Sequence, residues 1–102
     1  MNDDMLLRLE KIIADRKQNP DEASYTHHLF TKGRNKIAQK VGEEAVEVIV
    51  AALGQGEKEQ IAEISDLLYH LLVLMADLNL ELQDVFAELE KRHTLKAKPE
   101  DL

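Results

Sequence analysis

Five carboxylates lie on two consecutive segments of helical pattern, at spacings that could bind a metal ion. They are Glu43, Glu44 and Glu47 on the first segment, and Glu63 and Asp66 on the second. At about 100° per residue, each set falls on one side of its helix, so like charges become neighbours and repel. Apart from Lys40, no basic residue stands a turn away to neutralise them. We therefore expect a hard divalent cation such as Mg²⁺ to supply the missing positive charge.

The two segments are predicted to form an antiparallel helical hairpin. The apolar period predicts one helix from about Asn35 to Leu53 and another from about Glu57 to Leu78, joined by a tight turn at 54–56. Glu44 lies ten residues before Gly54, and Glu63 and Asp66 lie nine and twelve residues after it. Four to five carboxylates can thus converge at one height above the turn. The alternative is a solvated acidic face without a metal.

The remaining segments predict an all-α fold, an antiparallel bundle of about five helices. A first helix capped by Asn2 or Asp3 should end at 19–20, a short one should run from Ser24 to Gly33, and a last one from about Leu82 to His93. Residues 1–93 would form one domain and 94–102 a flexible tail. The helix at 57–78 is apolar around most of its circumference, so we expect a homodimer to complete the bundle.

Composition limits the class of protein. The 102 residues are 44% hydrophobic, contain no cysteine and carry a net charge of −7. The acidic balance argues against a nucleic-acid or anionic-membrane partner. The longest apolar stretch is too short to cross a bilayer, and the first residues do not resemble a signal peptide. A soluble protein is expected, and the lack of cysteine fits a reducing cytoplasm.

A window without acids precedes the acidic segments. Between Glu22 and Glu43 there is no Asp or Glu, while Lys32, Lys36 and Lys40 are present. Lysine side chains that precede a metal site along the helix suit a polyphosphate ligand, because they can bind its outer phosphates. Ordinary surface lysines would give the same pattern. His70, one turn after Asp66, could hold a metal-bound water or a phosphate, or it could be a hydrogen-bonded core residue.

These motifs resemble a known enzyme family. Glu43-Glu44-x-x-Glu47 followed by Glu63-x-x-Asp66 resembles the signature of the MazG-like all-α nucleoside-triphosphate pyrophosphatases. The wider pattern is similar to the phosphoribosyl-ATP pyrophosphatase family over about Pro20 to Arg92. It comprises Ser24-Tyr25-Thr26, Lys32-Gly33, Lys36-Ile37, Lys40 to Val48, and Glu63 to Leu71.

The resemblance implies Mg²⁺-dependent hydrolysis of phosphoribosyl-ATP to phosphoribosyl-AMP and pyrophosphate, the second step of histidine biosynthesis, in a cytoplasmic homodimer. As a hypothesis, catalysis would use the five carboxylates, with Glu44, Glu47, Glu63 and Asp66 as metal ligands and Glu43 as a further ligand or an orienting group. Substrate binding would fall to Lys32, Lys36, Lys40, Tyr25 and His70. Two alternatives stay open: a house-cleaning (d)NTP pyrophosphatase of the same superfamily, and a non-catalytic helical adaptor.

Overall fold

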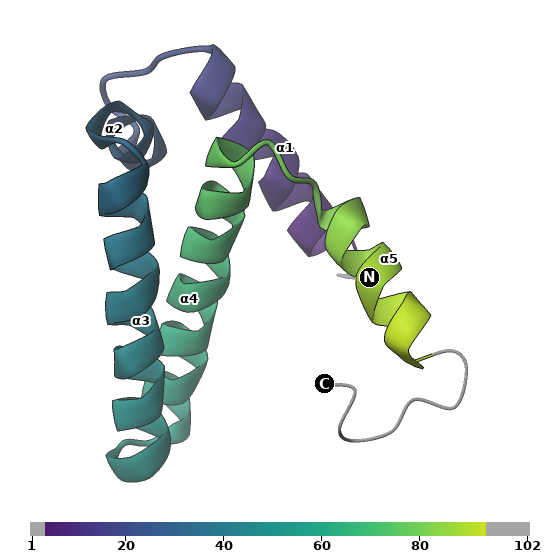
Figure 1. Cartoon of the computed structure of the whole chain (residues 1–102). Coiled ribbons are helices and arrows are strands. Elements are labelled where there is room, and N and C mark those ends of the chain that lie inside the picture. Colours follow the sequence, from purple (N-terminus) through teal and green to yellow (C-terminus); the bar gives the residue numbers. More distant parts are fainter. Residues whose placement is uncertain (1–3, 94–102) are drawn as a thin grey trace.

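The computed structural model describes residues 4–93, which form five α-helices and no strand (Figure 1). The helices are α1 (Met5–Gln18), α2 (Tyr25–Lys32), α3 (Arg34–Gly54), α4 (Glu57–Asp77) and α5 (Leu82–His93). The predicted all-α fold with five helices is confirmed, and the long helices begin and end within a residue of the predicted positions. The expected caps at Asn2 or Asp3 and the expected tail at 94–102 lie outside the described residues.

The α3–α4 hairpin is the frame of the molecule, and hydrogen bonds fix its register at both ends. At the open end, Arg34 Nε donates to Asp77 Oδ2 (2.7 Å) and Nη2 to the Asp77 carbonyl (3.1 Å). At the turn, the Gln60 amide donates to the carbonyls of Ala51 (3.1 Å) and Gln55 (3.0 Å). With both ends tied, the two helices cannot slide by a turn, so the residues that face each other midway are determined.

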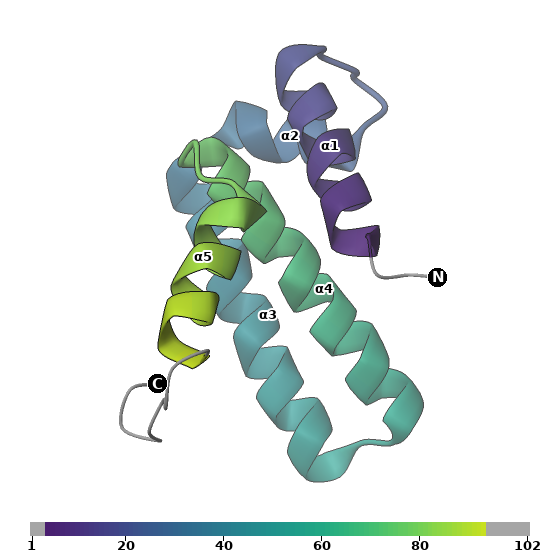
Figure 2. The ribbon, with the colours of Figure 1, turned by 90° about the vertical axis from the view of Figure 1, so that its right-hand side faces the viewer.

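The short helix α2 is placed across the open end of the hairpin by its two caps (Figures 1 and 2). Ser24 Oγ accepts a hydrogen bond from the His27 backbone N–H (3.1 Å), which is the predicted N-cap. Gly33 ends α2 at a φ of 95°, a conformation that favours glycine, and the next residue begins α3. The sharp change of direction brings the first turn of α2 against α4.

The buried core lies where α1, α2, the start of α3, the end of α4 and the start of α5 meet. Its fully or almost fully buried members are Ile13, Leu29, Ile37, Leu72, Val73 and Leu82. Away from this core, the hairpin leaves large apolar side chains exposed, here called the apolar hairpin surface: Val46, Ile49, Val50 and Leu53 on α3, and Ile61, Ile64, Leu68 and Leu71 on α4. Ile49 belongs to the apolar period that predicts the helix at 35–53, yet 58% of its side chain is exposed. Within residues 4–93, no helix is long and apolar enough to cross a membrane.

The connection between α4 and α5 is held by two charged residues of α1. Lys17 Nζ donates to the Ala76 carbonyl (2.7 Å) and to Asn79 Oδ1 (3.0 Å). Glu10 Oε2 accepts from the backbone N–H of Leu82 (2.6 Å), which begins α5. These bonds satisfy backbone groups that a helix end leaves without an intrahelical partner. Helix α1 therefore sets where α5 begins.

Candidate metal centre and substrate site

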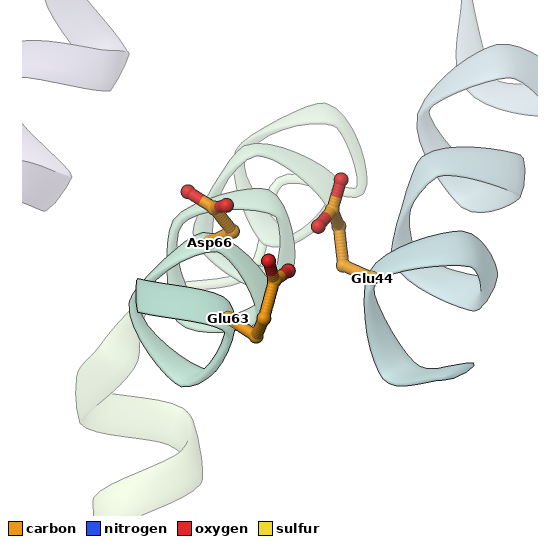
Figure 3. A group of neighbouring side chains, drawn as sticks. All are labelled: Glu44, Glu63 and Asp66. Carbon is orange, nitrogen blue, oxygen red and sulfur yellow. The ribbon is translucent and has the colours of Figure 1, made fainter. Parts of the chain in front are cut away.

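Three of the five predicted carboxylates converge across the hairpin. Glu44 extends from α3 toward α4, where Glu63 and Asp66 extend from the facing helix (Figure 3). One carboxylate oxygen from each lies within 4.8 Å of the others. The three side chains are thus close enough to share a divalent cation after small movements that bring their oxygens nearer to one another.

Two of these carboxylates have buried oxygens without a hydrogen-bond partner. Glu44 is 6% exposed, and its Oε2 and the Oε2 of Glu63 are both buried and unsatisfied. Burial, and then the neighbouring carboxyl of Glu47, raise the pKa of Glu44 above its ordinary value. A buried charged acceptor without a donor is costly. The oxygens of Glu44 and Glu63 are therefore positioned to receive a ligand from outside the chain.

The other two predicted carboxylates lie at the edge of this group. Glu47 is exposed and close enough to Glu44 to raise its pKa. Glu43 is exposed and accepts a hydrogen bond from the Gln39 amide (2.9 Å). The bond from Gln39, and then Lys40, lower the pKa of Glu43. Of two neighbours in one helical sector, the structure thus buries Glu44 and leaves Glu43 outside.

Lys40 is the last lysine of the window without acids and lies next to the acidic group. Its Nζ lies 3.5 Å from Glu43 Oε1 and 3.6 Å from Glu44 Oε1. Burial lowers the pKa of Lys40, but nearby Tyr25 and the two carboxylates outweigh it and raise that pKa overall. Lys36, one turn earlier and half-buried, contributes to the lowered pKa of Glu43. Lys32 is exposed at the last turn of α2.

Tyr25 and His70 form a hydrogen bond between α2 and α4. The Tyr25 hydroxyl lies 3.0 Å from His70 Nε2, and His70 Nδ1 lies 2.7 Å from the Asp66 carbonyl. A carbonyl only accepts, so Nδ1 donates, and Nε2 of the neutral ring accepts from the Tyr25 hydroxyl. His70 is buried, which matches the alternative of a hydrogen-bonded core histidine.

A second polar contact, which was not predicted from the sequence, lies beside this pair. Thr26 Oγ1 is hydrogen-bonded to the Tyr69 hydroxyl, again joining α2 to α4. Burial raises the pKa of Tyr69, and the bond from Thr26 opposes that rise. Tyr25 and Thr26 are neighbours on α2, and Tyr69 and His70 are neighbours on α4. The only signal available in the sequence was this adjacency of two polar or aromatic residues on each helix. The two bonds fix α2 next to Asp66.

The hairpin thus places three converging carboxylates beside Lys40, an arrangement that suits a metal site for a phosphate-bearing ligand. A family model described as phosphoribosyl-ATP pyrophosphohydrolase matches residues 6–93. The chain belongs to this family, which confirms the resemblance seen in the sequence.

Curated relatives agree with this assignment. A phosphoribosyl-ATP pyrophosphatase of Clostridium botulinum is 55% identical over 84 residues, covering 82% of this chain and 76% of the relative. One of Pyrobaculum neutrophilum is 50% identical over 92 residues, covering 90% and 98%. The histidine biosynthesis bifunctional protein HisIE of Caldanaerobacter subterraneus is 48% identical over 90 residues, which is 88% of this chain but only 44% of that relative. The similarity thus extends to free-standing relatives and to part of a longer one.

Proposed function

We propose that this chain hydrolyses phosphoribosyl-ATP to phosphoribosyl-AMP and pyrophosphate in histidine biosynthesis, with the carboxylates of α3 and α4 as its catalytic centre. The activity follows from the family and from the names of its relatives. The observation that carries the choice of site is the pair of buried, unsatisfied oxygens of Glu44 and Glu63 beside Asp66. Such a group has no structural use for a protein that only has to fold, because it costs stability.

The donor set fits Mg²⁺. It is made of carboxylate oxygens, which hard divalent cations prefer, and it comes from two helices held in register. Glu44, Glu63 and Asp66 would bind the ion, and Glu47 could complete its ligands from the edge. When bound, Mg²⁺ would neutralise charge on the phosphates and acidify a coordinated water.

The other residues of the site would bind and orient the substrate. Lys40 and Lys36 lie on the same face of α3 as Glu43 and Glu44 and would hold the outer phosphates. Lys32 would extend this basic row from the end of α2. Glu43, held by Gln39, would orient Lys40, to which it is ion-paired. A carboxylate of the cluster would accept the proton of the attacking water.

The assay uses phosphoribosyl-ATP with and without Mg²⁺, and identifies the products by mass. Phosphoribosyl-AMP and pyrophosphate should appear only with the metal, and Glu44→Gln should reduce turnover by about 100-fold or more, the scale of losing one electrostatic catalytic group. Faster cleavage of deoxynucleoside triphosphates than of phosphoribosyl-ATP would refute the substrate assignment. Metal-independent cleavage, or a fully active Glu44→Gln variant, would refute the site.

The proposal includes a homodimer of cytoplasmic chains, each with residues 1–93 as one domain. The support is the apolar hairpin surface, together with an apolar cavity of about 260 Å³ between α1, α4 and α5 whose lining includes Leu68 and Leu71. Exposed large apolar side chains gathered on one hairpin are typical of a surface that another protein covers. Ile49→Glu should shift the mass measured by sedimentation from dimer to monomer, whereas Ile12→Glu on α1 should not. An unchanged mass for Ile49→Glu would place the interface elsewhere.

A further inference from the structure

Tyr25 is half exposed although Tyr69 and His70 hold its ring. The chain has four aromatic residues other than histidine, all within residues 4–93, and Phe30, Tyr69 and Phe86 are partly buried. Tyr25 is 50% exposed. Its ring nevertheless stacks on Tyr69 (centroids 6.2 Å apart, planes at 27°) and meets the edge of His70 (5.9 Å, 80°). A ring that is both fixed and exposed is suited to receive a planar ligand with little loss of rotamer entropy.

This ring lies beside the carboxylate cluster. Its hydroxyl donates to His70, which is bonded in turn to the backbone carbonyl of Asp66 (2.7 Å). On the α3 side, Tyr25 is close enough to Lys40 to raise the pKa of that lysine, and Lys40 is 3.6 Å from Glu44. A nucleotide whose phosphates bind Lys40 and the carboxylates therefore has its base within reach of Tyr25.

We propose that the exposed face of Tyr25 is the stacking platform for the adenine ring of the substrate. This inference rests on the proposed function, because it uses the position of the phosphates to locate the base. Bases stack on aromatic side chains through their π-faces, and the contact needs the ring but not its hydroxyl. The hydroxyl has a separate role, because its bond to buried His70 orients the platform. Tyr25 is thus a specificity-determining residue for the base and takes no part in bond cleavage.

The test compares AMP with pyrophosphate as ligands, each in the presence of Mg²⁺. AMP carries the base but no phosphoanhydride bond, so it is not consumed, and pyrophosphate carries only the phosphate part. Calorimetry on Tyr25→Leu should show AMP binding weakened about 5- to 150-fold, the range for losing one base–aromatic stack, with pyrophosphate binding unchanged. Tyr25→Phe, which keeps the ring, should bind AMP within about threefold of the parent chain.

Proton NMR supplies a second readout that a structural role would not change. The chain has two tyrosines, so the ring signals of Tyr25 can be assigned by comparison with Tyr25→Phe. AMP should move them upfield through the ring current of the base, and pyrophosphate should not. The inference is overturned if Tyr25→Leu binds AMP normally, if it loses both ligands equally, or if Tyr25→Phe loses AMP as severely. None of these measurements needs turnover, so they stand apart from the activity assay that tests the proposed function.

Discussion

Replacing Glu44 by glutamine should make the metal-free protein more stable and the magnesium-bound protein less stable. Glu44 is the most buried carboxylate of the cluster, and its Oε2 has no hydrogen-bond partner. Burial, followed by Glu47, raises its pKa, so its charge opposes folding near neutral pH. Glutamine keeps the shape and removes that charge. If the substitution recovers about 1 kcal/mol, the scale of one unsatisfied buried group, Tm rises by about 4–8 °C for a domain of this size.

Magnesium should reverse the order of the two proteins. A ligand at 100 times its Kd stabilises the folded state by about 2.7 kcal/mol, which corresponds to roughly 10–20 °C here. Glu44→Gln replaces one of three grouped carboxylates by a neutral amide, which is a weaker ligand, so its gain at the same concentration should be much smaller. Thermal melts followed by circular dichroism, from no Mg²⁺ to millimolar Mg²⁺, should therefore cross between the variant and the parent chain.

The matched control is Glu59→Gln, which removes an exposed acid from the first turn of the same hairpin's second helix. That acid interacts favourably with the helix dipole, so its loss should lower Tm slightly and leave the magnesium response intact. The reasoning would fail if the metal-free melts of Glu44→Gln and the parent coincided. It would fail equally if Mg²⁺ raised both melting temperatures by the same amount.

Three further outcomes are expected. Because the folded-state pKa of Glu44 is raised, its contribution to stability is present below the ordinary carboxyl pKa and is lost as pH rises through the folded value. In metal-free urea titrations, the deficit of the parent chain relative to Glu44→Gln should grow as pH rises above the ordinary carboxyl pKa and level off above the folded value, and a constant difference would contradict this. Ile37→Ala should cost about 2–5 kcal/mol in the same titrations, since Ile37 is fully buried, while Ile49→Ala should cost less in the monomer and weaken self-association measured by sedimentation. Lys40→Met should lower kcat/KM for phosphoribosyl-ATP about 10- to 150-fold, the range for one charge-assisted hydrogen bond to phosphate, and a normal value in steady-state assays would remove Lys40 from the site.

Local signals in the sequence were enough to predict the helices and the hairpin. Ser24 and Gly33 mark the ends of α2 as cap residues do, and 54–56 gives the tight turn. The height of Glu44 above that turn, compared with Glu63 and Asp66, follows from the helical rise alone. A short turn transmits register directly, and for this reason the facing carboxylates could be predicted without tertiary information.

Features that depend on packing between distant helices could not be predicted in the same way. The helical period of apolar residues in α3 places Ile49 on an apolar side of the helix. It does not tell whether this chain or another chain covers that side. A Cβ built on Gly42, in the middle of α3, would meet no atom within 4 Å, so no contact within this chain explains a glycine there. The bond between Tyr25 and His70 depends on how α2 turns at Gly33, which no local pattern determines.

The carboxylates of the cluster come from segments that are close in the sequence, since Glu44 and Glu63 are only 19 positions apart. Contacts this close in sequence form early, because closing a short loop costs little entropy. We therefore expect the acids to come together when the two hairpin helices first pair, before the core around α1 is assembled. A divalent cation that relieves the repulsion between these carboxylates would therefore speed folding as well as stabilise the folded state.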